Sequence, residues 1–145
     1  MKIEIKIDGS CTEPEVIIKT DSVGQANDIV KLLSAEAMQM ITGIRNNEIE
    51  LLSYDDLIRI FAENGRVIAV TPSGEYFVRM RLYELEEQLS AHRFVRISNS
   101  EIINLKKVSS FDLSITGTIC VKLLNSDITY VSRRYVPKIK KILGI

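Results

Sequence analysis

A cluster of small hydrogen-bonding side chains lies in the second half of the chain. Ser98, Asn99 and Ser100 follow the alternating apolar and polar residues 94–97, and Asn104 comes four positions later. This pattern predicts a strand that leads into a polar loop held at the surface. An Asn side chain both donates and accepts hydrogen bonds, which the edge of adenine in the DNA major groove requires. From these residues alone, an Asn-rich turn that caps a hairpin is the favoured interpretation.

Side chains that could carry out catalysis are few and scattered. His92 is the one histidine and lies in a polar loop, where a solvated surface histidine is expected. Cys11 and Cys120 have no metal-ligand spacing, and the apolar run around Cys120 predicts a buried, inert thiol. No glycine-rich phosphate loop precedes a helix. We therefore expect no enzyme activity, no metal, no cofactor and no small-molecule substrate.

Charge is divided unevenly between the two halves of the chain. The 145 residues are 46% hydrophobic, enough to bury a core, and carry no net charge. Residues 1–60 hold 6 basic and 11 acidic groups, whereas residues 61–145 hold 13 and 8. A surface that faces DNA phosphates needs only a local basic excess, and the second half has one. No signal peptide or run of transmembrane length is recognisable, so a cytoplasmic location is expected.

The first forty-two residues predict two strands and a helix. Lys2–Asp8 alternates strictly, with its three isoleucines on one face, and Glu15–Thr20 reads as a second strand. Ser22 and Gln25 form a capping-box pattern that opens a helix. Its apolar stripe continues to about Ile41 through Val23, Ala26, Val30, Leu33, Ala37 and Met40. So small a segment does not easily fold alone, and its stripe should pack on the rest of the chain or on another subunit.

Residues 43–145 predict a separate, mainly β domain. A helix and a strand compete for residues 53–65, because Ser53 could cap a helix that Gly65 ends. Asn64-Gly65 indicates a tight turn, and strands at 67–70 and 76–80 form a hairpin. The other predicted elements are a short amphipathic helix that contains Leu82, Leu85 and Leu89 and ends near Ser90, a meander of strands over Val108–Ile115, Thr118–Leu124 and Ile128–Ser132, and a basic helix over Tyr135–Leu143.

Three motifs follow one another in the second part of the chain. They are Leu82-x-x-Leu85-x-x-x-Leu89, then Phe94-x-Arg96-x-Ser98-Asn99-Ser100-x-x-x-Asn104, then Val131-Ser132-Arg133-Arg134-Tyr135. Together these motifs resemble the LytTR family of bacterial DNA-binding domains. The resemblance covers about Ile44 to the end of the chain, and its specificity lies in the order and spacing of the motifs. It implies an elongated antiparallel β domain with short helices, α+β overall, and favours a turn at residues 54–56 followed by a strand. Ser98 stands where relatives commonly have His.

The resemblance implies a transcriptional regulator that binds double-stranded DNA sequence-specifically, with loops that enter successive major grooves. Arg96 and Asn104 have an alternative, structural role in bracing the central loop. The positions implied for reading bases are Arg66, Ser98, Asn99 and Arg134, and those implied for holding phosphates are Lys106, Lys107 and Arg133.

The role of residues 1–42 follows from their length. Most LytTR domains follow a phospho-acceptor receiver domain, and this segment is too short to form one. We expect it to form a homodimer contact or a docking surface for a regulatory partner, such as the small membrane proteins of similar stand-alone members. The alternative function is a LytTR-derived protein-interaction module that has lost DNA binding, which the missing His and the zero net charge keep open.

Overall fold

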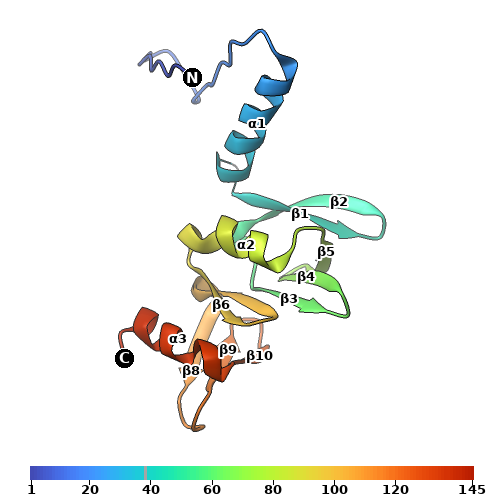
Figure 1. The fold of residues 1–145 in the computed structure, drawn as a ribbon, viewed down its shortest axis with the longest axis vertical. Coiled ribbons are helices and arrows are strands. Elements are labelled where there is room, and N and C mark those ends of the chain that lie inside the picture. Colours follow the sequence, from blue (N-terminus) through green and yellow to red (C-terminus); the bar gives the residue numbers. More distant parts are fainter. Residues whose placement is uncertain (38) are drawn as a thin grey trace.

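The computed structural model describes residues 1–37 and 39–145 of the chain. Over these residues it contains two antiparallel sheets and three α-helices. The helices are α1 (Val23–Ala37), α2 (Leu82–Leu89) and α3 (Val136–Leu143). Figure 1 shows α1 extending from one end of the β domain, with the N-terminal residues beyond it and α3 toward the opposite end.

The larger sheet has the strand order β2-β1-β5-β4-β3-β7-β6. Its strands are β1 (Met40–Arg45), β2 (Glu48–Ser53), β3 (Arg59–Glu63), β4 (Arg66–Thr71), β5 (Gly74–Val78), β6 (Phe94–Ser98) and β7 (Glu101–Asn104). The smaller sheet is the predicted meander, formed by β8 (Val108–Asp112), β9 (Ile119–Leu123) and β10 (Ile128–Val131). Every strand pair in the described part of the chain is antiparallel, which confirms the predicted fold class.

Local turn chemistry explains why the β3–β4 hairpin forms where the sequence predicts it. Asn64 and Gly65 both have left-handed backbone angles, with φ of 52° and 75°. A two-residue turn of this kind matches the twist of the flanking strands, and Asn-Gly tolerates it best. Glu63 then lies opposite Arg66 across the hairpin. The competition over residues 53–65 is settled in favour of a 3₁₀ turn, η1 (Tyr54–Asp56), followed by strand β3.

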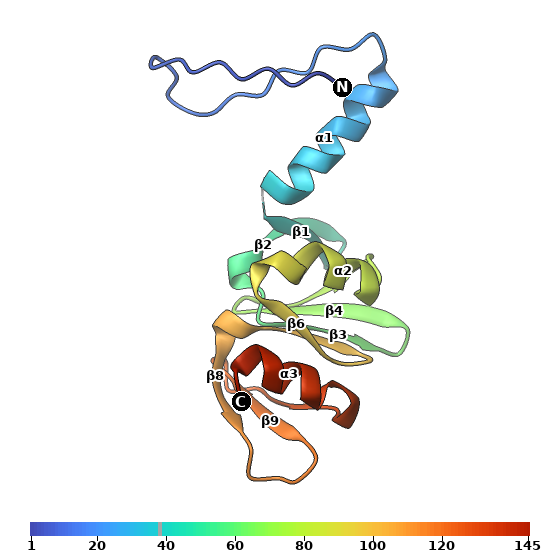
Figure 2. The same cartoon turned by 60° about the vertical axis from the view of Figure 1, so that its left-hand side comes forward.

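Two apolar clusters hold the domain together. One packs α2 against the larger sheet through the fully buried Leu85 and Leu89 of the predicted leucine motif. The other joins β6, β7, the smaller sheet and α3, with Ile97, Val131 and Ile139 at its centre. Figure 2 shows α3 beside the smaller sheet and close to β6. The second cluster therefore fixes the end of β6 relative to the residues that precede α3.

The N-terminal segment differs from the prediction in its strands. Residues 2–8 and 15–20 are extended but form no strand, because no other part of the described chain pairs with their backbones. Helix α1 does begin after Ser22, whose Oγ accepts a hydrogen bond from the Gln25 backbone N–H at 3.2 Å. The helix of the predicted ββα segment is thus confirmed. The prediction of two strands before it is wrong for the single chain.

The predicted helix also continues too far. α1 ends at Ala37, and Met40 and Ile41 belong to β1. Ile41 is buried and pairs with Leu52 of β2, a burial that helical periodicity alone cannot distinguish from the last turn of an amphipathic helix. The boundary predicted between residues 42 and 43 falls inside β1, and the division of the chain there stays a prediction.

Candidate nucleic acid interface

The loop of residues 98–100, between β6 and β7, is held by its own hydrogen bonds. Ser98 Oγ accepts a hydrogen bond from the Ser100 backbone N–H at 3.1 Å. Arg96 Nε donates to the Ser98 carbonyl at 2.8 Å, and another nitrogen of the same guanidinium donates to the Asn99 carbonyl. The β6–β7 register also shifts between Arg96 and Ser98. These contacts confirm the bracing role of Arg96 and leave the Asn99 side chain exposed.

Asn104 fixes the other end of β7. Its side chain is almost fully buried, donates from Nδ2 to the Leu57 carbonyl at 2.8 Å, and accepts at Oδ1 from the Lys106 backbone N–H at 3.0 Å. A buried amide needs such partners, because an unpaired one would lose its hydrogen bonds to water. The structural role predicted for Asn104 is therefore confirmed.

The 3₁₀ turn η4 (Arg133–Tyr135) lies directly against the 98–100 loop. The Ser132 backbone N–H donates to the Ile97 carbonyl at 2.9 Å, which attaches the end of β10 to the outer edge of β6. Tyr135 Oη donates to Asn99 Oδ1 at 3.2 Å. Arg133 and Arg134 are both exposed. Asn99 and Arg134, which come from motifs more than thirty residues apart, are thereby brought to one surface.

The β3–β4 turn borders the same loop on its other side. The Ala62 backbone N–H donates to the Ser100 carbonyl at 2.8 Å, so the end of β3 is joined to the loop. Arg66 begins β4 just beyond the Asn64-Gly65 turn and is exposed. Its guanidinium carbon lies 4.9 Å from the centre of the Phe77 ring, a cation–π geometry. The β3–β4 turn, the 98–100 loop and η4 therefore form a row at one end of the larger sheet.

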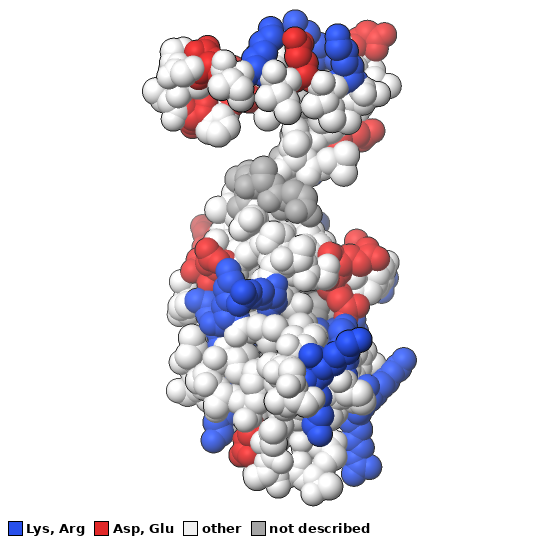
Figure 3. Space-filling view, turned by 90° about the vertical axis from the view of Figure 1, so that its left-hand side faces the viewer, with Lys and Arg blue, Asp and Glu red and all other residues white. Residues whose placement is uncertain are grey.

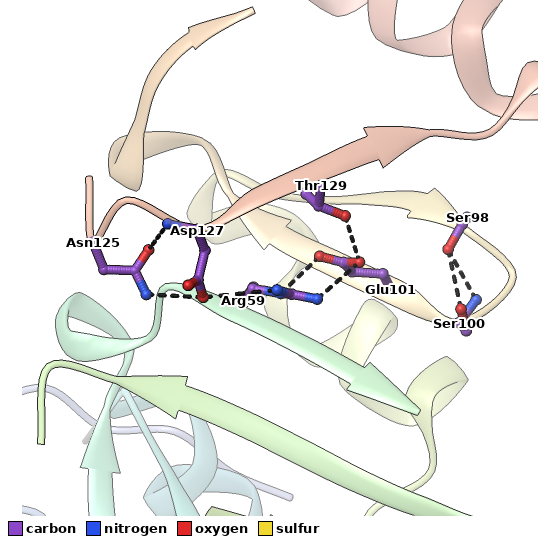
Figure 4. A network of polar contacts seen from close by, with 7 residues as sticks. All are labelled: Arg59, Ser98, Ser100, Glu101, Asn125, Asp127 and Thr129. Atoms are coloured by element: carbon purple, nitrogen blue, oxygen red, sulfur yellow. Dashed lines mark hydrogen bonds and ion pairs between the residues drawn. The ribbon is translucent and has the colours of Figure 1, made fainter. Parts of the chain in front are cut away.

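A buried ionic network ties the two sheets together beside this row (Figure 4). Glu101, only 7% exposed, accepts a hydrogen bond at Oε1 from Thr129 Oγ1 of β10 at 2.7 Å. Its Oε2 lies 2.9 Å from Arg59 Nε of β3. A second guanidinium nitrogen of Arg59 lies 3.7 Å from Asp127. Because Glu101 follows the loop and Thr129 shortly precedes η4, the network sets how the two loops lie relative to each other.

Burial affects the ionisation of this carboxyl group. Desolvation raises the pKa of Glu101 above its ordinary value of 4.5. The hydrogen bond from Thr129 and the charge of Arg59 act in the opposite direction without cancelling the effect of burial. The network is thus a structural brace whose strength depends on pH.

Lys106 and Lys107 are not brought to this row. They belong to η3 (Leu105–Lys107), which follows the far end of β7, about 13 Å along the strand from the loop at the rise of an antiparallel strand. Lys106 is exposed and its Nζ lies 3.9 Å from Asp55. Lys107 is half-buried, and its carbonyl accepts from the Leu124 backbone N–H at 2.8 Å. Of the predicted phosphate contacts, only Arg133 belongs to the turn that contacts Asn99, and its guanidinium lies close to Gly117.

Basic side chains predominate on the C-terminal part of the molecule. Figure 3 shows several separate groups of Lys and Arg among uncharged side chains on the lower part of this face, and one smaller acidic group there. Residues 132–145 include no acidic residue and contribute Arg133, Arg134, Lys138, Lys140 and Lys141. All five are exposed. The row thus borders a surface of the kind that attracts phosphate.

The side chains considered for catalysis lie apart from one another. The His92 ring packs edge-on against Tyr54, with centroids 5.0 Å apart, so this histidine is more enclosed than a solvated one. Cys120 is buried, as predicted, and Cys11 is exposed. Within residues 1–37 and 39–145, no three His, Cys, Asp or Glu side chains are grouped so as to hold a metal ion. No described helix is long and apolar enough to span a membrane.

Comparison with known proteins agrees with this geometry. The LytTr DNA-binding domain model matches residues 47–144. The chain belongs to the LytTR family. Its full length is 32% identical to 99% of an HTH-type transcriptional regulator of Staphylococcus aureus strain NCTC 8325, and 31% identical to the same share of one from strain MRSA252. A solved LytTr DNA-binding domain from a Bacillus cereus protein shares the fold, with a TM-score of 0.71, 18% identity, and coverage of 74% of this chain and 98% of the other.

The LytTR fold differs from what the names of these relatives suggest. In the described part of the chain, strands β1–β5 separate α1 from α2, and β6–β10 separate α2 from α3. No two consecutive helices are thus joined by a short turn, as a helix-turn-helix requires. The family is a DNA-binding family and not a class of enzymes.

Sequence reasoning assigned no role to Tyr135, Glu101, Arg59 or Thr129. Tyr135 was visible as the last residue of the Ser132-Arg133-Arg134-Tyr135 motif, yet nothing in the spacing indicated that its hydroxyl reaches Asn99. Glu101 looks like an ordinary solvated residue beside the polar loop. One signal was available, since Glu101 is followed by Ile102 and Ile103 in a strand that is buried throughout.

Proposed function

We propose that this LytTR protein is a transcriptional regulator that reads a specific double-stranded DNA sequence through the row of three loops. One observation carries the proposal. The hydrogen bond from Tyr135 to Asn99, with the backbone bond from Ser132 to Ile97, places an exposed arginine pair beside an exposed asparagine on a braced surface. Asparagine and arginine are the side chains best suited to hydrogen-bond base edges.

The dimensions of the row suit two successive grooves. The β4, β3, β7 and β6 strands are consecutive in the sheet, so about 14 Å separates β4 from β6, and η4 lies one further strand spacing outward. Two extended arginine side chains lengthen this span toward the roughly 34 Å between successive major grooves on one side of B-DNA. We therefore place Arg66 and Arg134 in successive major grooves and the 98–100 loop between them.

Each side chain of the row has a suitable chemistry. Arg66 and Arg134 can each donate two parallel hydrogen bonds to a guanine. The Asn99 oxygen already accepts from Tyr135, but it has a second lone pair, and its amide nitrogen brings two donors. Ser98 contributes less, because its hydroxyl already supports the loop by accepting from the Ser100 backbone. The Ser98 hydroxyl stands where relatives commonly have an imidazole, and we infer that its main role is to hold the loop in shape.

Phosphate contacts set the position of the domain on the duplex. Arg133 is the nearest candidate because it lies beside Arg134 in η4. Lys106 and Lys107 would hold a more distant stretch of the backbone, beyond the far end of β7. Phosphates are the same beside every base pair, so these three residues would provide affinity and not specificity.

A homodimer is the assembly that the N-terminal segment supports. Val23, Val30 and Leu33 of the predicted stripe are 79%, 48% and 40% exposed, so the described chain does not cover its own helix α1. A two-fold dimer would present two copies of the row to two half-sites. A regulatory membrane protein could use the same segment, and the dimer is preferred because a sequence feature described below fits it.

The proposal is tested by comparing two kinds of substitution. Asn99→Ala or Arg134→Ala should cost on the order of 1 to 3 kcal/mol on a cognate duplex with little change on scrambled DNA. Arg133→Ala should weaken both duplexes about equally and lower the salt slope by roughly one. Fluorescence anisotropy with DNA from upstream of the protein's own gene, over a range of salt concentrations, measures all three.

Lys106→Ala is the matched control that tests whether the contact with DNA extends beyond the row to η3. If η3 holds a phosphate, this variant should behave as Arg133→Ala does; unchanged binding would restrict the contact to the row. Circular dichroism must show that every variant is folded. If the folded wild-type chain binds upstream and scrambled DNA equally weakly, the DNA-binding proposal is wrong and the protein-interaction module takes its place.

A further inference from the structure

Residues 2–8 form an extended, unpaired segment with two distinct faces. Ile3, Ile5 and Ile7 are 77%, 80% and 94% exposed and point to one side of an extended chain, because side chains alternate along a strand. The other face carries Lys2, Glu4, Lys6 and Asp8. No backbone hydrogen bond is made by residues 2–7 within the described chain, whereas the Asp8 carbonyl accepts from Cys11 in the following turn. The segment therefore has both a free apolar face and free backbone groups.

The charges on this strand are complementary to themselves. When two copies run antiparallel with Ile5 opposite Ile5, Lys2 lies opposite Asp8, and Glu4 lies opposite Lys6. Two-fold symmetry repeats both pairs, so every charge on the face meets one of opposite sign. Ile3 lies opposite Ile7, which gathers the isoleucines of both copies on the other face. Such cross-strand pairs are the unit by which antiparallel sheets are stabilised.

Other registers lose this complementarity. A shift by two residues brings Glu4 opposite either Asp8 or Glu4 of the other copy, and Lys6 opposite a lysine. A shift by one residue places isoleucines opposite charged side chains and destroys the apolar face. A parallel, in-register pair would set each charge beside its own copy. Of the registers that pair residues 2–8 over their whole length, only the antiparallel one centred on Ile5 satisfies both faces.

We propose that a second copy of this chain pairs with residues 2–8 as an antiparallel strand across a two-fold axis at Ile5. The inference rests on the proposed homodimer and adds its location and register. The paired strands supply the backbone hydrogen bonds that each lacks alone, and the joined isoleucine face is available to pack against the exposed apolar side chains of α1. Two DNA-binding domains are thereby joined through segments that lie beyond α1 (Figure 2).

Cysteine cross-linking of the full-length chain tests the register. In a Cys11→Ser background, where the remaining Cys120 is buried, Ile5→Cys places two thiols face to face across the axis. Directly opposite residues in an antiparallel pair are about 4.5 to 5.5 Å apart, a separation that a disulfide can bridge. Mild oxidation should link most of the Ile5→Cys chains into covalent dimers in non-reducing electrophoresis.

Two matched variants control for random collision. Ile3→Cys alone should cross-link poorly, because each new thiol faces Ile7 and lies about 13 Å along the strand from its copy. A mixture of Ile3→Cys and Ile7→Cys chains should regain efficient cross-linking. Equal linking by Ile3→Cys and Ile5→Cys would overturn the register.

Charge reversal tests the same pairing without a new covalent bond. Glu4→Lys sets lysine opposite Lys6 twice across the axis and should weaken dimerisation by roughly threefold to thirtyfold in analytical ultracentrifugation. Adding Lys6→Glu restores opposite charges and should restore the dimer, although each substitution alone weakens it. Failure of this rescue would also reject the proposed register.

The outcomes separate this inference from the proposed function. A wild-type dimer that does not cross-link at residue 5 would reject the strand pairing and leave the homodimer in place. A wild-type monomer at tens of micromolar would reject both. Neither result affects the row, because binding of one domain to a single half-site, and its loss in Asn99→Ala, are measured independently of dimerisation.

Discussion

Residues 2–8 alternate strictly between charged and apolar side chains, whereas strand β5 ends in three consecutive aromatic or apolar residues, yet only β5 lies in a sheet. Tyr76 and Val78 of β5 are buried, while Glu75 and Phe77 between them face outward. β5 is hydrogen-bonded to β4 along its length and to β1 at Ile44, so its backbone groups are paired on both sides. Residues 2–8 have the more regular sequence pattern and no partner within the described chain.

The difference between these segments shows what an alternating pattern does and does not specify. Alternation decides which side chains share a face, because the strand repeat is two residues. It says nothing about which strand supplies the hydrogen bonds. In the β domain, short turns deliver the partner strand within a few residues. At the N-terminus, the pairing that we propose takes the partner strand from a second copy of the chain.

The largest expected effect is on the free energy of unfolding, when a core isoleucine is replaced by alanine. The same replacement at an N-terminal isoleucine is the comparison. Ile103 is fully buried in β7, so Ile103→Ala should lower the free energy of unfolding of the β domain by about 2 to 5 kcal/mol. Ile5→Ala should change it by less than about 0.5 kcal/mol, because Ile5 touches no core. Urea unfolding of dilute protein, followed by circular dichroism, measures both.

Protein concentration sharpens this comparison. The effect of Ile5→Ala on unfolding should grow as the concentration rises and the wild-type chain dimerises, since association stabilises the paired state. Ile103→Ala should show the same loss at every concentration. If Ile5→Ala destabilised the dilute monomer as strongly as Ile103→Ala, residues 2–8 would have to pack on the chain's own β domain.

The elements that were predictable from the sequence carry local signals. Asn64-Gly65 specifies its turn by backbone conformation, and the leucine spacing of α2 places Leu85 and Leu89 on its buried face. β1 and β2 were missed although a similar signal joins them. Asn46 and Asn47 both have positive φ, 53° and 63°, as a tight hairpin turn requires. The helical periodicity that continued through Met40 and Ile41 concealed this turn.

The candidate site was predictable only in part, because its parts meet through tertiary contacts. The resemblance placed Asn99 and Arg134 in separate motifs, and their closeness depends on Tyr135 reaching across from η4. For Lys106, closeness to Asn99 in the sequence gives the wrong expectation of closeness in the structure. This lysine is only seven residues from Asn99, but an intervening strand carries it to the other end of β7. Proximity in a sheet follows strand order and not chain order.

A smaller effect on stability is expected from the buried ionic network that links the two sheets. Because burial raises the pKa of Glu101 above 4.5, the folded state binds the proton more tightly than the unfolded state. The resulting contribution to stability is complete below pH 4.5 and is lost as the pH rises through the raised pKa. Glu101→Gln cannot titrate, so wild type should lose stability relative to this variant between pH 4.5 and neutrality.

Urea unfolding of both proteins at a series of pH values checks this sign. Thr129→Val is a useful companion, because it removes the hydrogen bond that opposes the effect of burial and should strengthen the pH dependence. A stability difference between wild type and Glu101→Gln that stays constant with pH would mean that the carboxyl titrates alike in the folded and unfolded states.

The smallest expected effect concerns the hydroxyl that joins η4 to the central loop. Tyr135→Phe keeps the ring and removes only the Oη that donates to Asn99, so the fold should be unchanged. If this bond orients Asn99 for a base edge, cognate affinity should fall by about 0.5 to 1.5 kcal/mol, the usual net value of one hydrogen bond. In an Asn99→Ala background the same change should have almost no effect, because the two residues act as a pair. Anisotropy titrations of the four proteins complete this cycle. Tighter binding by Tyr135→Phe would show instead that Tyr135 competes with DNA for the Asn99 oxygen, and that the row is held partly closed until DNA displaces that contact.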